Sequence, residues 1–514
     1  VVAHGSGNVL LQAQGAGTSL TANANADVQS TTGHVTLLAA AAITLNASVD
    51  VSTGGAGTLT VTASTGAVAM NVSSHLTAGT GDVRVSAAAD VVVGGVISTI
   101  GNVSLTATAG SILDADTDGT VDVLAARLRL VAGTGVGVLG AAVNPLETTV
   151  GTASARATGG GINLLESDGL VVGDASATVQ QVNADATVTA VTDVTQSDLV
   201  TTSGNGSIVL RTTVGSLQLD DGTAPADNVA VSAHGLGNVL LQTLPDSGSL
   251  TLNADVQTGG GHVTLDAGTH LILVATADVR VSGAGTINAV ARTGSFTQAD
   301  NSRLQSGTGA VRVRAQVDVR LGGVTTGGNA SLTAVTGSIL DAGSAFGGED
   351  VVAAGLRLDA GVGAGVLGGA NDPLETAVGT VTGRATSGGL NLLESDAVAV
   401  GTVSVTVSAV NADGTGTAVT DAAQAGLVTT AGNGTIVLRN LQGGVTVNNV
   451  VTAHGTGNVL LSATTDVTLN ADVSSGGGIS TSIDLSNPSP QQSAGGSNWS
   501  ALVKFADTAG TSSH

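Results

Sequence analysis

Apolar and polar residues alternate along this chain in many short runs. The segment 33–55 holds three of them: Val35-Thr36-Leu37, Ile43-Thr44-Leu45 and Val49-Asp50-Val51. Alternation with a period of two predicts β-strands that bury one face and expose the other. Helical spacing is absent, and β-branched residues and Gly dominate, which disfavours helices. The pattern therefore predicts three short strands in every segment of about 24 residues.

This short unit recurs along the chain. Gly-x-apolar positions begin at Gly33, Gly57 and Gly81, and similar landmarks follow throughout. Strands repeated in series at a fixed interval can stack, with like strands about 4.8 Å apart. We therefore predict an all-β fold, a single-stranded parallel β-helix or β-solenoid. We expect it to be right-handed, with three short strands per turn of about 24 residues.

A longer repeat contains the short one. Ala3–Leu11 returns as Ala233–Leu241 and again as Ala453–Leu461, and Asn163–Asp168 returns as Asn391–Asp396. Repetition of this kind is typical of stacked arrays stabilised by nearest neighbours. The predicted organisation is one continuous solenoid over residues 1–475. It contains module 1 (1–230), module 2 (231–450) and a partial module 3 (451–475), and a divergent tail follows at 476–514.

Composition agrees with a narrow interior and limits the possible partners. The chain has 76 Gly, 1% aromatic residues, and neither Cys nor Tyr, so Val, Leu, Ile and Ala must fill the core. The net charge of −23 disfavours nucleic acid and anionic lipid, which both attract Lys and Arg. No apolar run reaches membrane-spanning length, so we expect no membrane insertion. Residue 1 is Val and no signal peptide is visible, so we expect any export signal to lie outside this sequence.

The serial rungs resemble those of a known protein family. Gly101-Asn102-Val103-Ser104-Leu105-Thr106-Ala107 and Asn46-Ala47-Ser48-Val49-Asp50-Val51 carry the resemblance. They are similar to the repeats of filamentous-haemagglutinin-type β-helix adhesins and related giant bacterial surface proteins. The resemblance covers residues 1 to about 475. It implies an exported, non-catalytic stem that serves adhesion or long surface fibres.

One acidic segment suggests a cation site. Asp114, Asp116 and Asp118 alternate with other residues and are followed by Gly119, as at the start of a calcium-binding loop. The twelfth position of such a loop is Ala125 instead of Glu, and module 2 lacks the second and third acids. The alternatives are therefore calcium at Asp114, Asp116 and Asp118, or a solvated acidic turn.

Other polar residues favour structural roles. His4, His234 and His454 recur with the module and have no second ligand at metal-binding spacing, so we interpret them as turn residues. Glu166 and Asp168 form a carboxylate pair that a glycosidase would need, and the pair recurs in module 2. Aromatic platforms for sugars are missing, so we interpret the pair as a polar turn and predict no catalytic residue.

The tail carries apolar bulk that is rare elsewhere in the chain. Trp499, Leu502, Val503 and Phe505 follow a Pro-containing segment that interrupts strand pairing. The end of a stack needs a cap or a partner, because its unpaired strand edge invites association. The tail residues therefore predict either a cap or an end-to-end assembly surface.

Together these observations predict a non-enzymatic extracellular β-solenoid, the rod of a bacterial cell-surface adhesin or fibre. Its expected partners are further copies joined end to end, or a host or cell-surface ligand. A self-assembling head-to-tail filament subunit is one alternative, and a polysaccharide-active β-helix enzyme is another. No cofactor is expected apart from the calcium considered above.

Overall fold

The computed structural model describes residues 1–244, 248–343 and 348–483. Among these residues the regular structure is β-strand except for one 3₁₀ turn, η1 (Gly368–Ala370). Nearly all strand pairs are parallel and join successive turns of the chain. The fold is a parallel β-helix, as predicted from the alternating pattern. None of the described helical residues forms a segment long and apolar enough to cross a membrane.

The described chain divides into two compact units. The first contains Val1–Thr269, Thr276–Val281 and Ala409–Thr417. The second contains His270–Ala275, Ser282–Ser408 and the described residues from Ala418 onward.

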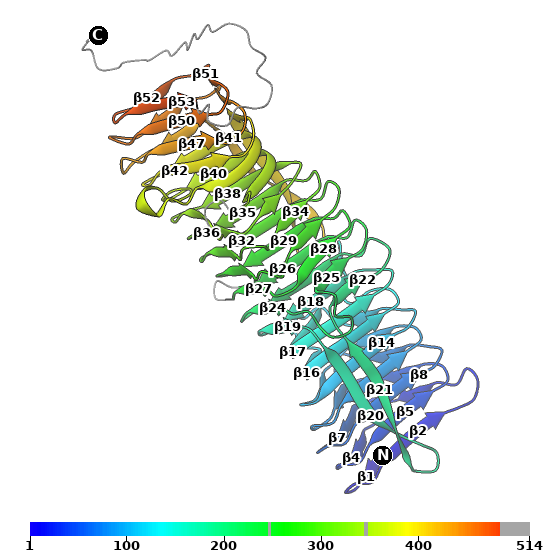
Figure 1. Ribbon diagram of the computed structural model, residues 1–514. Coiled ribbons are helices and arrows are strands. Elements are labelled where there is room, and N and C mark those ends of the chain that lie inside the picture. The colour runs from blue at the N-terminus through cyan, green and yellow to red at the C-terminus, as the bar shows by residue number, and fades with distance from the viewer. Residues whose placement is uncertain (245–247, 344–347, 484–514) are drawn as a thin grey trace, which may run out of the picture. The chain divides into compact units, whose positions relative to one another are not determined.

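Three parallel ladders run through the early turns of the first unit (Figure 1). The first ladder contains β1 (Val2–Ala3), β4 (Val28–Ser30), β7 (Asp50–Thr53), β10 (His75–Thr77) and β13 (Ile97–Ser98). The second contains β2 (Val9–Ala13), β5 (Val35–Ala39), β8 (Leu59–Ala63), β11 (Val83–Ala87) and β14 (Asn102–Ala107). The third contains β3 (Leu20–Ala22), β6 (Ile43–Leu45), β9 (Val68–Met70), β12 (Val91–Val93) and β15 (Ile112–Asp114).

Stacking in register explains the apolar pattern. Val35 pairs with Leu59, and Leu59 with Val83, so equivalent positions of neighbouring turns lie on top of one another. All three side chains are buried. Alternation places every second side chain in the interior, where small aliphatic residues fill the space between the ladders.

Two long strands interrupt the scheme of three short strands per turn. β16 (Val123–Ala132) pairs with both β13 and β14 of the turn before it. β17 (Leu146–Ala157) pairs with β16 on one side. On its other side it pairs with β18 (Ile162–Glu166), β19 (Leu170–Val172) and β22 (Leu199–Thr201). The equivalents in the second unit are β40 (Val351–Ala360) and β41 (Leu374–Ala385), which pair with each other.

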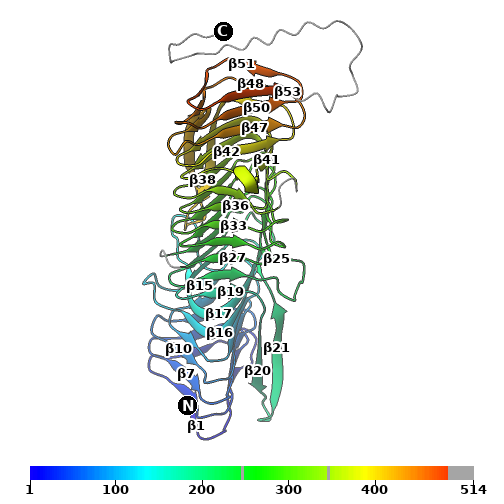
Figure 2. The ribbon, with the colours of Figure 1, turned by 60° about the vertical axis from the view of Figure 1, so that its left-hand side comes forward.

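An antiparallel hairpin, which the sequence pattern did not predict, covers part of the first unit. β20 (Ala175–Val182) pairs with β21 (Val188–Gln196), and β20 lies across β5, β8, β11, β14 and β16 (Figures 1 and 2). Val182 N donates to Thr36 Oγ1 at 2.9 Å, and Arg84 Nε pairs with Asp193 Oδ1 at 3.0 Å. Thr36 is fully buried although it points outward from the solenoid, because the hairpin covers it.

A second hairpin repeats this arrangement. β44 (Thr402–Val410) pairs with β45 (Gly416–Ala425), and Thr402–Ser408 and Ala418–Ala425 of this hairpin belong to the second unit. Arg312 Nε pairs with Asp421 Oδ1 at 3.0 Å, as Arg84 does with Asp193. The tip of this hairpin, Ala409–Thr417, is part of the first unit, where Val410 packs with Val209 and Leu240.

The remaining strands continue the stack within each unit. Those of the first unit are β23 (Ile208–Thr212), β24 (Leu217–Leu219), β25 (Val229–Ala233), β26 (Val239–Thr243), β27 (Leu250–Leu252), β28 (Asp255–Thr258), β29 (Val263–Ala267) and β31 (Val279–Val281). Those of the second unit are β30 (Leu271–Leu273), β32 (Ile287–Ala291), β33 (Phe296–Gln298), β34 (Leu304–Ser306), β35 (Val311–Ala315), β36 (Val319–Leu321), β37 (Val324–Thr325), β38 (Asn329–Ala334), β39 (Ile339–Asp341), β42 (Leu390–Glu394), β43 (Val398–Val400), β46 (Leu427–Thr429), β47 (Ile436–Asn440), β48 (Val445–Val447), β49 (Val451–Ala453), β50 (Val459–Ala463), β51 (Val467–Leu469), β52 (Val473–Ser475) and β53 (Ile479–Ile483). Because β53 pairs with β50, parallel pairing extends past residue 475, where the sequence predicted the tail to begin.

Candidate functional site: two buried carboxylate clusters

Three carboxylates meet beside the first pair of long strands. Asp114, Asp122 and Glu147 each offer one oxygen, and these oxygens lie within 4.8 Å of one another. We call these residues the first carboxylate cluster. Their exposed fractions are only 8%, 5% and 6%.

The stacked turns bring these residues together. Asp114 ends β15, Asp122 directly precedes β16, and Glu147 is the second residue of β17. Asp122 and Glu147 are 25 positions apart, about one turn. Glu147 N donates to Asp122 Oδ2 at 3.0 Å, and Asp122 N donates to the carbonyl oxygen of Glu147 at 2.9 Å. Adjacent rungs therefore hold the two carboxylates against each other.

Local donors satisfy only part of the first cluster. Asn144 Nδ2 donates to Asp114 Oδ2 at 2.9 Å, and Asp116 N donates to Asp114 Oδ1 at 3.0 Å. Glu147 Oε2 is buried and has no hydrogen-bond partner in the described structure. An unpartnered buried carboxylate oxygen is costly, because it has lost its water without gaining a donor.

Burial changes the acidity of this cluster. Desolvation, reinforced by the neighbouring Asp114 and Glu147 carboxylates, raises the pKa of Asp122 to about 9. Desolvation and the charge of Asp114 raise the pKa of Glu147 to about 7. Three carboxylates this close cannot all ionise cheaply without a compensating positive charge.

Module 2 builds the same cluster. Asp341, Asp350 and Glu375 also offer oxygens within 4.8 Å of one another, and their exposed fractions are 8%, 4% and 6%. We call them the second carboxylate cluster. Glu375 N donates to Asp350 Oδ2 at 3.0 Å, as Glu147 N does to Asp122. Burial, with the charge of Asp341, raises the pKa of Asp350 to about 10.

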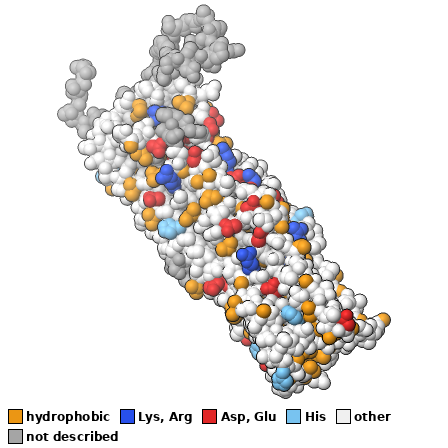
Figure 3. Space-filling view, turned by 60° about the horizontal axis from the view of Figure 1, so that its bottom comes forward, with side chains coloured by type: hydrophobic (Ala, Val, Ile, Leu, Met, Phe, Trp, Pro, Cys, Tyr) orange, Lys and Arg blue, Asp and Glu red, His pale blue; other side chains and the backbone are white. Residues whose placement is uncertain are grey.

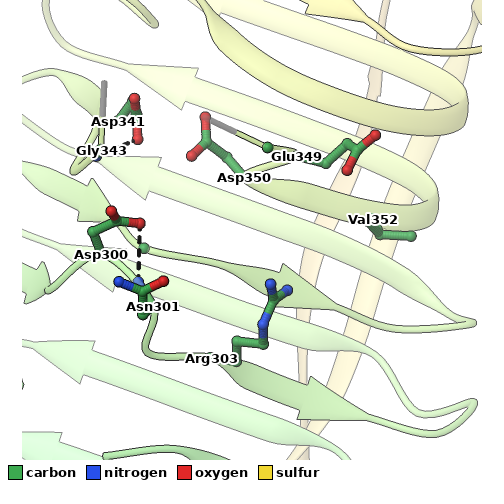
Figure 4. Close-up of a pocket in the computed structure, with 10 residues that line it drawn as sticks. Asp300, Asn301, Arg303, Asp341, Gly343, Glu349, Asp350 and Val352 are labelled. Atoms are coloured by element: carbon green, nitrogen blue, oxygen red, sulfur yellow. Dashed lines mark hydrogen bonds between the residues drawn. The ribbon is translucent and has the colours of Figure 1, made fainter. Parts of the chain in front are cut away.

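A polar cavity adjoins the second cluster. Its volume is about 140 Å³, and its lining includes Asp300, Asp341, Glu349 and Asp350. Figure 4 shows the side chains of Asp341 and Asp350 facing one another across a short gap, with Asp300 on a neighbouring turn. Four acidic residues and one basic residue, Arg303, therefore line a space large enough for an ion and several waters.

The three aspartates expected to bind calcium, Asp114, Asp116 and Asp118, do not together form one of the groups of three carboxylates whose oxygens lie within 4.8 Å of one another in the described structure. Asp114 belongs to the first cluster, but Asp116 and Asp118 cap successive turns of the loop that follows. Asp116 Oδ1 accepts from Asp118 N at 3.1 Å, and Asp118 Oδ1 accepts from Thr120 N at 2.8 Å. The sequence reasoning missed Glu147 as a cluster member. The signal that could have found it is the recurrence of the Asp122–Glu147 interval as Asp350–Glu375.

The carboxylate pair considered for sugar chemistry is divided between the interior and the surface. Glu166 is fully buried, and burial raises its pKa to about 8. It accepts from Thr148 Oγ1 at 2.7 Å and from Val150 N, while Asp168 is exposed. Glu394 accepts from Thr376 Oγ1 in the same way. Glu166 and Glu394 thus hold the loops of neighbouring turns together.

The remaining candidate residues lie in turns or outside the described structure. His4, His234 and His454 are exposed, and the carbonyl oxygen of each accepts a bond from the Gly three positions later. The predicted assembly residues Trp499, Leu502, Val503 and Phe505 lie outside the described residues.

Comparison with known proteins identifies no relative. The chain matches no family model, no curated protein and no solved structure. The fold and the residues themselves therefore carry the functional argument.

Proposed function

We propose that this chain is a non-enzymatic extracellular structural β-solenoid, the rod of a bacterial cell-surface adhesin or fibre. The observation that carries the proposal is the in-register stacking of equivalent strands, as in the succession Val35, Leu59, Val83. A ladder of backbone hydrogen bonds between turns resists both stretching and proteases, because few backbone groups are free. The resemblance of its rungs to filamentous-haemagglutinin-type adhesins supports the same role.

The arrangement of charged groups also favours a structural role. A glycan-cleaving enzyme needs two carboxyl groups in a cleft that a polymer can enter. The carboxylates of both clusters and of Glu166 and Glu394 are instead buried among neighbouring turns. In the face shown in Figure 3, acidic and basic side chains are scattered among neutral ones and form no single charged patch.

Covering hairpins fit a structural stem as well. Each hairpin shields outward-facing residues and is held by a partly buried ion pair, Arg84–Asp193 in the first unit and Arg312–Asp421 in the second. A strap of this kind stabilises several turns at once without forming an active-site cleft. In this proposal, the exposed loops of the stem bind the ligand.

Two assays test the proposed function. The purified chain should release no reducing sugar or unsaturated product from a panel of acidic and neutral glycans. Displayed on a bacterial surface, it should survive protease treatment and extend an attached reporter domain away from the cell. Glycan cleavage that is lost in Glu166→Gln or Glu147→Gln would overturn the proposal in favour of an enzyme.

A further inference from the structure

We propose that each carboxylate cluster is a binding site for one calcium ion, held by Asp114, Asp122 and Glu147 in module 1 and by Asp341, Asp350 and Glu375 in module 2. Calcium prefers carboxylate and carbonyl oxygens at distances of about 2.3–2.6 Å. Three oxygens within 4.8 Å of one another can all reach one ion placed between them.

Glu147 supplies an observation independent of the clustering. Its Oε2 atom is buried without a hydrogen-bond donor. The buried Glu166, by contrast, accepts bonds from Thr148 and Val150. Among the described residues, Asp198 Oδ1 is the other buried carboxylate oxygen without a hydrogen-bond partner, and Asp198 belongs to neither cluster. A cation bound between the three carboxylates would supply the partner that the Glu147 oxygen lacks.

No protein cation takes this place in the first cluster. None of the ion pairs among the described residues involves Asp114, Asp122 or Glu147. Burial lowers the pKa of the Arg211 guanidinium, and the negative charge of Glu147 offsets part of this effect. One guanidinium can compensate at most one carboxylate, so ionisation of all three acids needs a further positive charge.

The second module shows that the arrangement is not accidental. The loops that join the first two acids differ, with Asp116 and Asp118 in one module and Glu349 in the other. The three cluster residues nevertheless keep the same burial and the same backbone bond from the glutamate to the aspartate. Calcium fits better than magnesium because it accepts irregular oxygen sets, whereas magnesium demands near-octahedral geometry.

Isothermal titration of the full-length chain with calcium chloride tests the proposal. We expect two ions per chain, with a dissociation constant on the order of 10⁻⁴–10⁻³ M, as in extracellular calcium modules. Asp122→Asn or Asp350→Asn should reduce the number to one, and the double variant should abolish binding. Magnesium chloride should bind at least tenfold more weakly.

Matched controls separate the clusters from the acidic loop and from general charge effects. Asp116→Asn with Asp118→Asn and, separately, Glu166→Gln should still bind two ions. Circular dichroism without calcium checks that every variant keeps the β-sheet spectrum. If Asp122→Asn fails to fold, Glu147→Gln replaces it in the titration.

Three results would overturn the proposal. They are no saturable calcium binding up to 10 mM, unchanged stoichiometry in the double variant, and loss of binding in the Asp116/Asp118 control. Equal affinity for magnesium would refute the assignment to calcium. None of these results bears on whether the chain is a structural stem, so the two proposals fail separately.

Discussion

The two modules hold three carboxylates in the same arrangement but connect them with different loops. Between Asp114 and Asp122 the chain carries Asp116 and Asp118, which cap their own turns. Between Asp341 and Asp350 the corresponding segment has neither acid, and its Glu349 lines a cavity. The feature common to both modules is the cluster, and the loop motif is a local variation. Internal repetition thus separates the residues that stacking holds together from those that merely lie close in sequence.

Neutralising both clusters should produce the largest effect. In the Asp122→Asn, Asp350→Asn variant, calcium should no longer stabilise the fold. At a calcium concentration of 100 times the dissociation constant, each lost site removes about 2.7 kcal/mol, or roughly 5 kcal/mol for two independent sites. Urea unfolding with and without calcium measures the difference. An equal calcium effect in the variant and the original chain would contradict the cluster assignment.

Neutralising one cluster tests whether the two sites are equivalent. Glu147→Gln and Glu375→Gln should each remove about half of the calcium-dependent stabilisation, roughly 2.7 kcal/mol. Because the backbone contacts agree, we expect the two affinities to differ by less than tenfold, about 1.4 kcal/mol. Calcium titrations followed by thermal unfolding provide both values. If Glu375→Gln leaves the calcium-dependent stabilisation unchanged, only the first cluster binds an ion.

The equivalent buried residues Glu166 and Glu394 should make the free energy of unfolding depend on pH. Burial raises the pKa of each from about 4.5 to about 8 in the folded chain. The folded state therefore holds the proton more tightly than the unfolded state, and stability falls as the pH rises through this window. We expect the double variant Glu166→Gln, Glu394→Gln to lose a pH-dependent difference on the order of 2 kcal/mol. Urea unfolding at pH 5.5 and pH 6.5 would show it, and a stability that rises with pH because of these residues would contradict their assignment.

Changing the acidic loop alone should have the smallest effect. Asp116→Asn and Asp118→Asn keep an oxygen that can accept the turn hydrogen bonds. Surface substitutions of this kind usually change stability by less than about 0.5 kcal/mol. The same unfolding experiment measures the change. A loss as large as that of Asp122→Asn would make the loop, and not the cluster, the cation site.

Much of the fold could be predicted from the sequence, because each turn is encoded by the same short alternation of apolar and polar residues. The runs at Val35, Ile43 and Val51 became strands β5, β6 and β7 with buried apolar residues. The hairpins were not predicted from the sequence, because apolar and polar residues alternate in β20 and β21 as they do in the stacked strands. Alternation predicts a strand but does not specify which strand it pairs with. A signal existed in the spacing: Ile162 pairs with Ile208, about twice the usual interval, so an extra element had to fit between them.

The candidate site was predicted only in part. Asp114 was selected for its place in a loop motif, and the structure brings it to Asp122 and Glu147. Their contact depends on the register between turns, in particular on the long strands β16 and β17, which a motif of consecutive residues does not contain. The comparison of Asp122 and Glu147 with Asp350 and Glu375 would have supplied this information from sequence alone.

Small-angle X-ray scattering tests the central claim, that a stack of equivalent turns forms a structural rod. The full chain should be compared with a variant from which residues 6–235 are deleted, so that Gly5 joins Leu236 at the equivalent position. If the account is right, the variant keeps the same cross-section. It also becomes shorter by about 40 Å, since it loses roughly nine turns at about 4.8 Å each. A compact particle, or a variant that shrinks equally in all dimensions, would contradict the account.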